Sequence, residues 1–204
     1  MKEAFGEICK ARGVDLNKRV PVDINGVTHE LTHGALAIAA VTSCTTATDA
    51  SMMLAAGLLA RNAANQGLSP KPWVKCILAP GSRATESILD SAGLMPGLRK
   101  LGFYTCGFGC MSCIGNSGPV LPFMHDIADD IELASILSGN RNFEGRISPD
   151  VSQNYLSAPM LVIAYSLVGT MDFDFESEPL GENAQGEDVY LRDILPCLLY
   201  TSPS

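Results

Sequence analysis

ALAIAAVT (35–42) is an uncharged apolar run that leads directly into the polar stretch SCTTATDAS (43–51). A short apolar run that ends in a polar loop is typical of a buried strand. The segment that follows, SMMLAAGLLARNAANQG (51–67), has its apolar residues at helical spacing and ends at a glycine, which is a common helix stop. These segments predict a strand, a loop and a helix in that order.

The same alternation continues along the chain. Three further apolar runs predict strands: WVKCILAP (73–80), GFYTCGFG (102–109) and LASILSG (133–139). Helices are expected at ATESILDSAGL (84–94) and near residues 121–130. Strands that alternate with helices favour an α/β fold, here a layered α/β/α sandwich with a mostly parallel sheet.

Residues that can carry chemistry follow the ends of these predicted strands. Cys44, Cys110 and Arg141 each come just after one of them. Open α/β sheets place their ligand sites beyond the carboxyl ends of the strands. We therefore expect these residues to contribute to one shared site.

The composition indicates a real core under an acidic surface. The 204 residues are 47% hydrophobic and 18% charged, and the net charge is −8. This charge argues against DNA and RNA as partners, because neutralising phosphates requires a basic surface. The longest apolar runs are too short to span a bilayer, so no membrane partner is expected. Arginines that are grouped locally can still bind a small anion.

The chain has seven cysteines, and its start, MKEAFGEICKARG, lacks the apolar stretch of a secretory signal. We expect a reducing, cytoplasmic compartment, where clustered cysteines bind metals or do chemistry. Cys76 and Cys106 lie inside predicted apolar strands and are expected to be small core residues.

Cys110 and Cys113 form a C-x-x-C pair within GFGCMSCIGNSGP (107–119). By itself, this pair leaves metal binding, a redox couple and incidental placement about equally open. Cys44, at the same expected edge, adds a third thiolate. Three thiolates can hold three irons of a [4Fe–4S] cluster, and the fourth iron is then open to substrate and water as a Lewis acid.

At this point several blocks of the sequence resemble the aconitase family, in the branch of bacterial aconitase A and the iron-regulatory proteins. The blocks occur in the family's order and the likeness extends over about residues 30–196. They are VTSCTT (41–46), KPWVKCILAPGSR (71–83), GFGCMSCIGNSGP (107–119), LSGNRNFEGR (137–146) and APMLVIAYSLVGTMDFDF (158–175).

The resemblance implies a [4Fe–4S] cluster held by Cys44, Cys110 and Cys113. It also implies that Arg141 and Arg146 bind the carboxylates of a small di- or tricarboxylate substrate. Asn140 would lie beside the cluster. Members of the family interconvert citrate and isocitrate through cis-aconitate.

Guanidinium groups suit a tricarboxylate, because they are permanently charged and bind carboxylates in bidentate fashion. On the residues alone, ion pairs between the two arginines and nearby carboxylates such as Glu144 and Asp150 are about as plausible.

The resemblance also implies the third, cluster-binding domain of a longer enzyme. Residues 33–172 would form this α/β iron–sulfur domain. Residues 1–32, with a turn at Asn25-Gly26, would be a lead-in from a truncated preceding domain. The acidic residues 173–204 would be a linker toward a missing C-terminal swivel domain.

The family's catalytic base belongs to that missing domain, so no catalytic residue is assigned. Ser82, within GSR (81–83), belongs to a motif of this domain itself, and His33 and His125 are expected to be surface or capping residues. As an isolated chain, the protein is therefore expected to have little or no dehydratase activity.

Two departures from the family pattern leave alternatives open. Thr46 stands where the family usually has asparagine, and Met-Ser fills the spacer of the cysteine pair where Thr-Thr is common. The alternatives are a 2-methylcitrate-type dehydratase and a non-catalytic relative that binds RNA or a metal such as zinc. Ile-Gly-Asn after Cys113 favours the aconitase A branch over the methylcitrate branch, which tends to have Asn-Gly-Met there.

Overall fold

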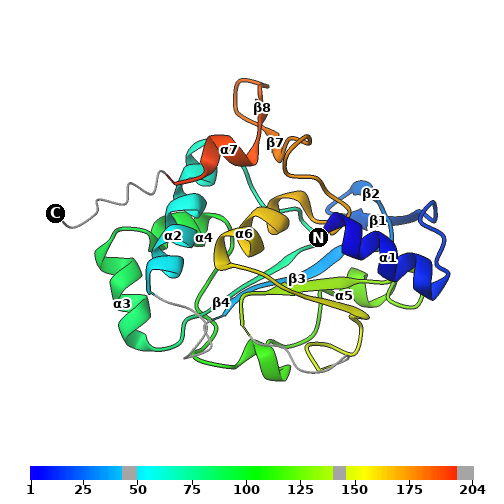
Figure 1. The fold of residues 1–204 in the computed structure, drawn as a ribbon, viewed down its shortest axis with the longest axis horizontal. Helices are drawn as coiled ribbons and strands as arrows, with labels where there is room; N and C mark the ends of the chain where they lie inside the picture. Colours follow the sequence, from blue (N-terminus) through cyan, green and yellow to red (C-terminus); the bar gives the residue numbers. More distant parts are fainter. Residues whose placement is uncertain (43–49, 140–145, 197–204) are drawn as a thin grey trace.

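A computed structural model of the protein describes residues 1–42, 50–139 and 146–196 (Figure 1). Its centre is a four-stranded, fully parallel sheet with the strand order β4-β3-β5-β6. The elements are α1 (Lys2–Arg12), β1 (Val20–Ile24), β2 (Val27–Leu31), β3 (Leu36–Thr42), α2 (Ala50–Asn65), β4 (Lys75–Ala79), α3 (Arg83–Ser91), α4 (Met95–Lys100), a 3-10 turn η1 (Ser112–Ile114), α5 (Pro122–His125), β5 (Ala134–Leu137), β6 (Gln153–Leu156), α6 (Pro159–Val168), β7 (Gly181–Glu182), β8 (Asp188–Val189) and α7 (Leu191–Ile194).

Strand β3 confirms the prediction made from ALAIAAVT. All seven of its residues are buried, because β4 and β5 flank it and both faces of the sheet are covered. The pairing with β5 shifts register between Leu36 and Ile38, and Ala37 and Ile38 then pack on the same side of the sheet. An uncharged run is what such a doubly buried strand requires.

The layered α/β sandwich is also confirmed. On one face, α1, α2, α4 and α6 contribute to a large apolar core whose biggest members include Phe5, Met53, Leu59 and Leu98. The opposite face is covered by the β1–β2 hairpin, by α5 and by the turns around them. That second layer is therefore a hairpin with a four-residue helix rather than a row of long helices.

The N-terminal segment is joined to this architecture. The hairpin turns at Asn25 and Gly26, whose φ angles of 54° and 81° are the left-handed values of a two-residue hairpin turn, so the expected turn is confirmed. On the other face, Phe5 and Cys9 of α1 are buried in the main core.

Two predicted elements are wrong in extent. GFYTCGFG (102–109) forms only an isolated bridge between Leu78 and Thr105, and Cys106 is exposed rather than a core residue. Gly102 and Gly109 have φ values of 75° and 69°, which end an extended segment on both sides. The helix expected near 121–130 is the short α5, and turns follow it.

Two further elements complete the sheet layer. β6 adds an edge strand and α6 follows it.

The acidic segment that begins at Phe173, which the composition suggested to be a linker, contacts the main core over its described part. Four of its apolar residues are buried there: Phe173, Leu180, Val189 and Ile194. No helix in the described part of the chain is long and apolar enough to cross a membrane.

Candidate functional site

The order of the strands identifies the point where a ligand site is expected. From β3 the chain passes to β4 on one side, and it returns to β5 on the other side, so the order reverses between β3 and β5. Open α/β sheets bind ligands at the carboxyl ends of the strands at such a reversal. The residues that follow these two strands include Cys44, Asn140 and Arg141, all of which lie outside the described residues.

The turn that carries the cysteine pair is attached to this edge by the backbone of Gly109. The amide of Gly109 donates to the carbonyl of Pro80 over 2.8 Å, just after β4. The hydroxyl of Thr42, the last residue of β3, donates to the carbonyl of Gly109 over 3.1 Å. The next residue, Cys110, is exposed, whereas Cys113 is 5% exposed.

The sulfur of Cys113 lies between the ends of β3 and β5. A β-carbon on Gly139 would lie 2.8 Å from Cys113 Sγ and 2.8 Å from the methyl group of Thr42. The two strand ends are tied together by Ser138, whose hydroxyl accepts from the Thr42 amide over 2.9 Å and donates to the Thr42 carbonyl over 2.7 Å. The structure thus brings Cys113 to the reversal point that the topology defines.

After the cysteine pair, the chain returns along the second face of the sheet, where Lys75 holds it. The ammonium group of Lys75 donates to the carbonyls of Ser117 and Pro119, both over 2.7 Å. Burial lowers the pKa of Lys75 below its usual range. The two charge-assisted hydrogen bonds satisfy the ammonium group and fix the loop to the first residue of β4.

Arg146 is the one predicted substrate-binding arginine within the described residues. It is partly buried, and the carbonyl of its backbone lies directly against the α-carbon of Gly115. The neighbouring Ile147 is 1% exposed and belongs to the same apolar cluster as Cys113. The segment that carries Arg146 is therefore packed against the turn that carries the cysteine pair.

His33, His125 and Ser82 make contacts within the fold. His125 Nδ1 lies 2.9 Å from a carboxylate oxygen of Asp150, on the surface. His33, expected at the surface or in a cap, is instead buried, and its Nδ1 accepts from the backbone amide of Glu132 over 3.0 Å. Ser82 is the N-cap of α3 and accepts from the amide of Thr85.

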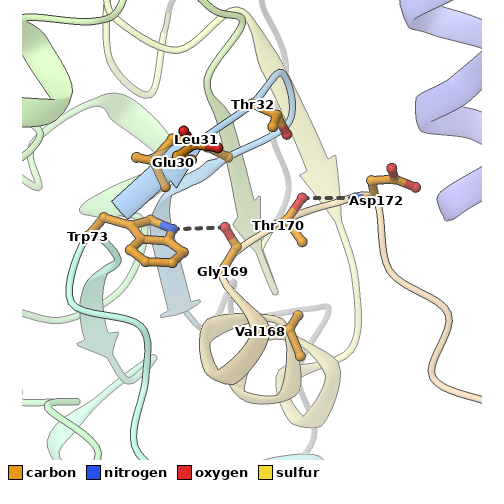
Figure 2. A pocket seen from close by; sticks show the side chains of 9 residues that line it. Glu30, Leu31, Thr32, Trp73, Val168, Gly169, Thr170 and Asp172 are labelled. Atoms are coloured by element: carbon orange, nitrogen blue, oxygen red, sulfur yellow. Dashed lines mark hydrogen bonds between the residues drawn. The ribbon is translucent and has the colours of Figure 1, made fainter. Parts of the chain in front are cut away.

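A hollow of about 200 Å³ lies elsewhere, at the amino end of β3 (Figure 2). It is lined on one side by the end of the hairpin and Trp73, and on the other by the segment after α6. The indole of Trp73 donates to the carbonyl of Gly169 over 2.9 Å, and the amide of Asp172 donates to the hydroxyl of Thr170 over 3.2 Å. It lies at the edge opposite to Cys113 and contributes nothing to the candidate site.

Three residues at the site were missed by the reasoning from sequence. Thr42, Ser138 and Gly139 act through packing and hydrogen bonds between the ends of β3 and β5, and a single sequence gives no direct sign of such contacts. Their place at the ends of two predicted apolar runs was the available signal. Among the described residues, no group of three or more His, Cys, Asp or Glu side chains is placed to hold a metal ion.

Comparison with known proteins connects this geometry to a family. The model of the Aconitase family (aconitate hydratase) matches residues 7–169.

Curated relatives extend over almost the whole chain. Aconitate hydratase A of Corynebacterium jeikeium is 54% identical over 179 residues, which is 87% of this chain and 19% of the relative. The protein of the same name from Thermus thermophilus is 53% identical over 90% of this chain and 20% of the relative. The one from Deinococcus radiodurans is 49% identical over 95% of this chain and 22% of the relative. The chain thus spans about a fifth of the length of the curated relatives it matches.

Proposed function

The chain belongs to the aconitase family, and from this premise we propose that it is the cluster-holding segment of an aconitate hydratase. In the complete protein, the reaction would be the interconversion of citrate and isocitrate through cis-aconitate. The observation that carries the proposal is the position of the Cys113 sulfur at the reversal point of the sheet, between the strand ends that lead into Cys44 and Asn140.

The residues present fit a sulfur-ligated cluster. Cys110 and Cys113 offer thiolates at one edge, and the missing β-carbon of Gly139 leaves room beside the second of them. The hydroxyls of Ser112 and Ser117 are buried and have no hydrogen-bond partner among the described residues. Buried polar atoms of this kind call for a partner. Ser112 lies between the two cysteines in the sequence, and the thiolates and sulfides of a cluster accept hydrogen bonds.

We propose Cys44, Cys110 and Cys113 as the three protein ligands. When bound, a [4Fe–4S] cluster held by three thiolates supplies a Lewis-acidic iron that no protein ligand occupies. Cys76 is unsuited to this role, because burial raises the pKa of its thiol to about 12.

Thiolate ligands must also be kept reduced. We therefore also propose that the protein is located in the cytoplasm, which is a reducing compartment.

The protein's own contribution to the substrate is binding and orientation. We propose that Arg141 and Arg146 bind substrate carboxylates through bidentate, charge-assisted hydrogen bonds, with Asn140 beside the cluster. Holding a tricarboxylate at two points restricts its rotation before the reaction, which lowers the entropic part of the barrier. The catalytic base is proposed to lie in the remainder of the complete protein, since Ser82 caps a helix and His125 is paired with Asp150.

Metal analysis of the anaerobically reconstituted chain tests the proposal. We expect about four irons and four acid-labile sulfides per chain, as for one [4Fe–4S] cluster. Cys113→Ser is expected to lower both contents strongly, whereas Cys106→Ser, at an exposed cysteine, leaves them unchanged. Stoichiometric zinc without sulfide would instead identify a structural metal module.

A substrate comparison in the complete protein tests the second half of the proposal. Turnover of citrate well above that of 2-methylcitrate is the expected result. The reverse order would move the protein to the methylcitrate branch while keeping the cluster.

A further inference from the structure

We propose that Gly115 is a positioning residue. Because it has no β-carbon, the backbone of Arg146 can pack directly against it, and this contact fixes the position of Arg146 relative to Cys113. This inference rests on the proposed function, because it takes Arg146 as a substrate-binding residue. Gly115 itself is proposed neither to bind the substrate nor to hold the cluster.

The contact between Gly115 and Arg146 is a backbone contact. A β-carbon on Gly115 would overlap the carbonyl oxygen of Arg146 and would lie 3.6 Å from its carbonyl carbon and 3.7 Å from the carbonyl oxygen of Ile147. A flexible side chain could turn away from such an overlap, but a carbonyl group moves only with its peptide plane. Any larger residue at position 115 must therefore displace the chain at Arg146 or the cysteine turn itself.

The segment that follows Arg146 is anchored at two further points. The side chain of Ile147 is 1% exposed and packs in the apolar cluster that includes Cys113, Val120 and Met124. A few residues later, the carboxylate of Asp150 pairs with His125 of the short helix α5. These anchors hold the chain in place directly after Arg146, where the contact with Gly115 is made.

The turn that carries the cysteine pair, residues 110–115, is short. Gly115 ends the 3-10 turn η1 with a φ of 76°, and its amide donates to the carbonyl of Ser112 over 3.2 Å. Only one residue separates it from Cys113. One end of this rigid unit is thus a proposed cluster ligand, and the other end bears on a proposed substrate-binding residue.

Gly118 provides a matched control within the same loop. It has the same φ of 76°, but among the described residues a β-carbon there would meet only Lys75 Nζ, at an ordinary contact distance of 3.4 Å. Gly115→Ala and Gly118→Ala therefore impose the same left-handed backbone strain, and only the first pushes on Arg146.

The test measures the dissociation constant for citrate by calorimetry, together with iron and sulfide contents, in the complete hydratase that contains this chain. Gly115→Ala is expected to keep its iron and sulfide and to weaken citrate binding by about 10- to 100-fold, the range that the loss of a hydrogen bond between charged groups causes. Gly118→Ala is expected to bind citrate within about twofold of the wild type, the scatter of independent sites.

A double mutant separates positioning from general damage. If Gly115 acts through Arg146, Gly115→Ala adds nothing to the loss already caused by Arg146→Ala. Should Gly115→Ala fail to fold, Ile147→Val takes its place, because it removes one methyl group from the side chain that anchors the segment after Arg146. Citrate binding of Ile147→Val is then measured both with Arg146 present and in the Arg146→Ala protein. It is expected to weaken citrate binding only when Arg146 is present.

Two results would overturn the positioning role: unchanged citrate affinity in the folded Gly115→Ala protein, or a loss of equal size with and without Arg146. The wild type distinguishes this failure from a failure of the proposed function. A wild-type protein that holds its cluster and binds no citrate contradicts the function itself, whereas normal binding in both wild type and Gly115→Ala contradicts only the positioning role.

Discussion

Gly139 and Gly115 have no β-carbon, and this lets the turn with the cysteine pair approach the end of β5 and the segment of Arg146. At Gly139 the missing β-carbon leaves space for the sulfur of Cys113, and at Gly115 it leaves space for the carbonyl of Arg146. Only Gly115 of the two also needs its left-handed φ. At the scale of single residues, the site thus depends on close approach between segments as much as on its reactive side chains.

The pair of His125 and Asp150 predicts a pH dependence of stability. The hydrogen bond to Asp150, with the charges of Asp150, Asp126 and Asp129, raises the pKa of His125 above its ordinary value of 6.5. A group whose pKa is higher in the folded state contributes its full stabilisation below the unfolded pKa and loses it as pH rises through the folded pKa. The contribution is therefore present at about pH 6 and lost toward about pH 8.5.

Thermal unfolding of the wild type and His125→Gln at both pH values checks this expectation. The variant should unfold at a lower temperature than the wild type near pH 6, and the difference should shrink near pH 8.5. An equal difference at both pH values would mean that the charge on His125 plays no part.

At the scale of elements, the packing of α4 on α2 depends on a glycine against a backbone. A β-carbon on Gly97 would lie 2.8 Å from the α-carbon and 3.0 Å from the amide nitrogen of Arg61. Gly6, within α1, has no described residue within 4 Å of the same position. Each is a glycine inside a helix, so the two differ mainly in what a methyl group would meet.

These glycines predict opposite effects of the same substitution. Gly97→Ala forces α4 away from α2 and should lower the free energy of unfolding by about 1–3 kcal/mol, the usual cost of overpacking. Gly6→Ala should raise it by about 0.5–1 kcal/mol, because alanine loses less conformational entropy in a helix. Denaturant unfolding of both variants measures this, and a shift of the same sign in both would contradict the close crossing of the two helices.

Elements also show why some predictions from sequence succeeded and others did not. β3 is buried on both faces, and its uncharged apolar run therefore predicted a buried strand correctly. The apolar residues of α2 have a clear helical spacing, which predicted the helix. β6, with the sequence QNYL, lies at the edge of the sheet, where Gln153 and Tyr155 are buried and the residues between and after them are more exposed. Its polar residues do not form the apolar run by which the other strands were predicted. GFYTCGFG is apolar enough for a strand, but its glycines turn the backbone after a single bridge.

At the scale of the whole molecule, two apolar clusters on opposite faces of one sheet hold the chain together. The chain nevertheless spans about a fifth of the length of its relatives. A site at the edge of a sheet needs further walls to exclude water from the reacting atoms. This segment is proposed to supply cluster ligands and anion-binding groups, and among its described residues we assign no catalytic base.

The isolated chain is therefore expected to hold its cluster and yet not turn over cis-aconitate. Spectrophotometric assay of the iron-reconstituted chain, beside a full-length relative such as that of Thermus thermophilus, measures this directly. A rate near that of the relative would show that the base lies within these residues after all.

The sequence alone determined the α/β class, the central strand, the spacing of Cys110 and Cys113, and the resemblance that implies the chemistry. Each of these depends on residues that are near one another in the chain, and local hydrophobic pattern and spacing carry that information. Only the tertiary structure decided that Cys113 meets Gly139, that Gly115 meets Arg146, and that His125 meets Asp150. These contacts join segments about 25 to 31 residues apart in the sequence, and they arise because the connections before β5 and β6 return over the same face of the sheet and pack against each other there.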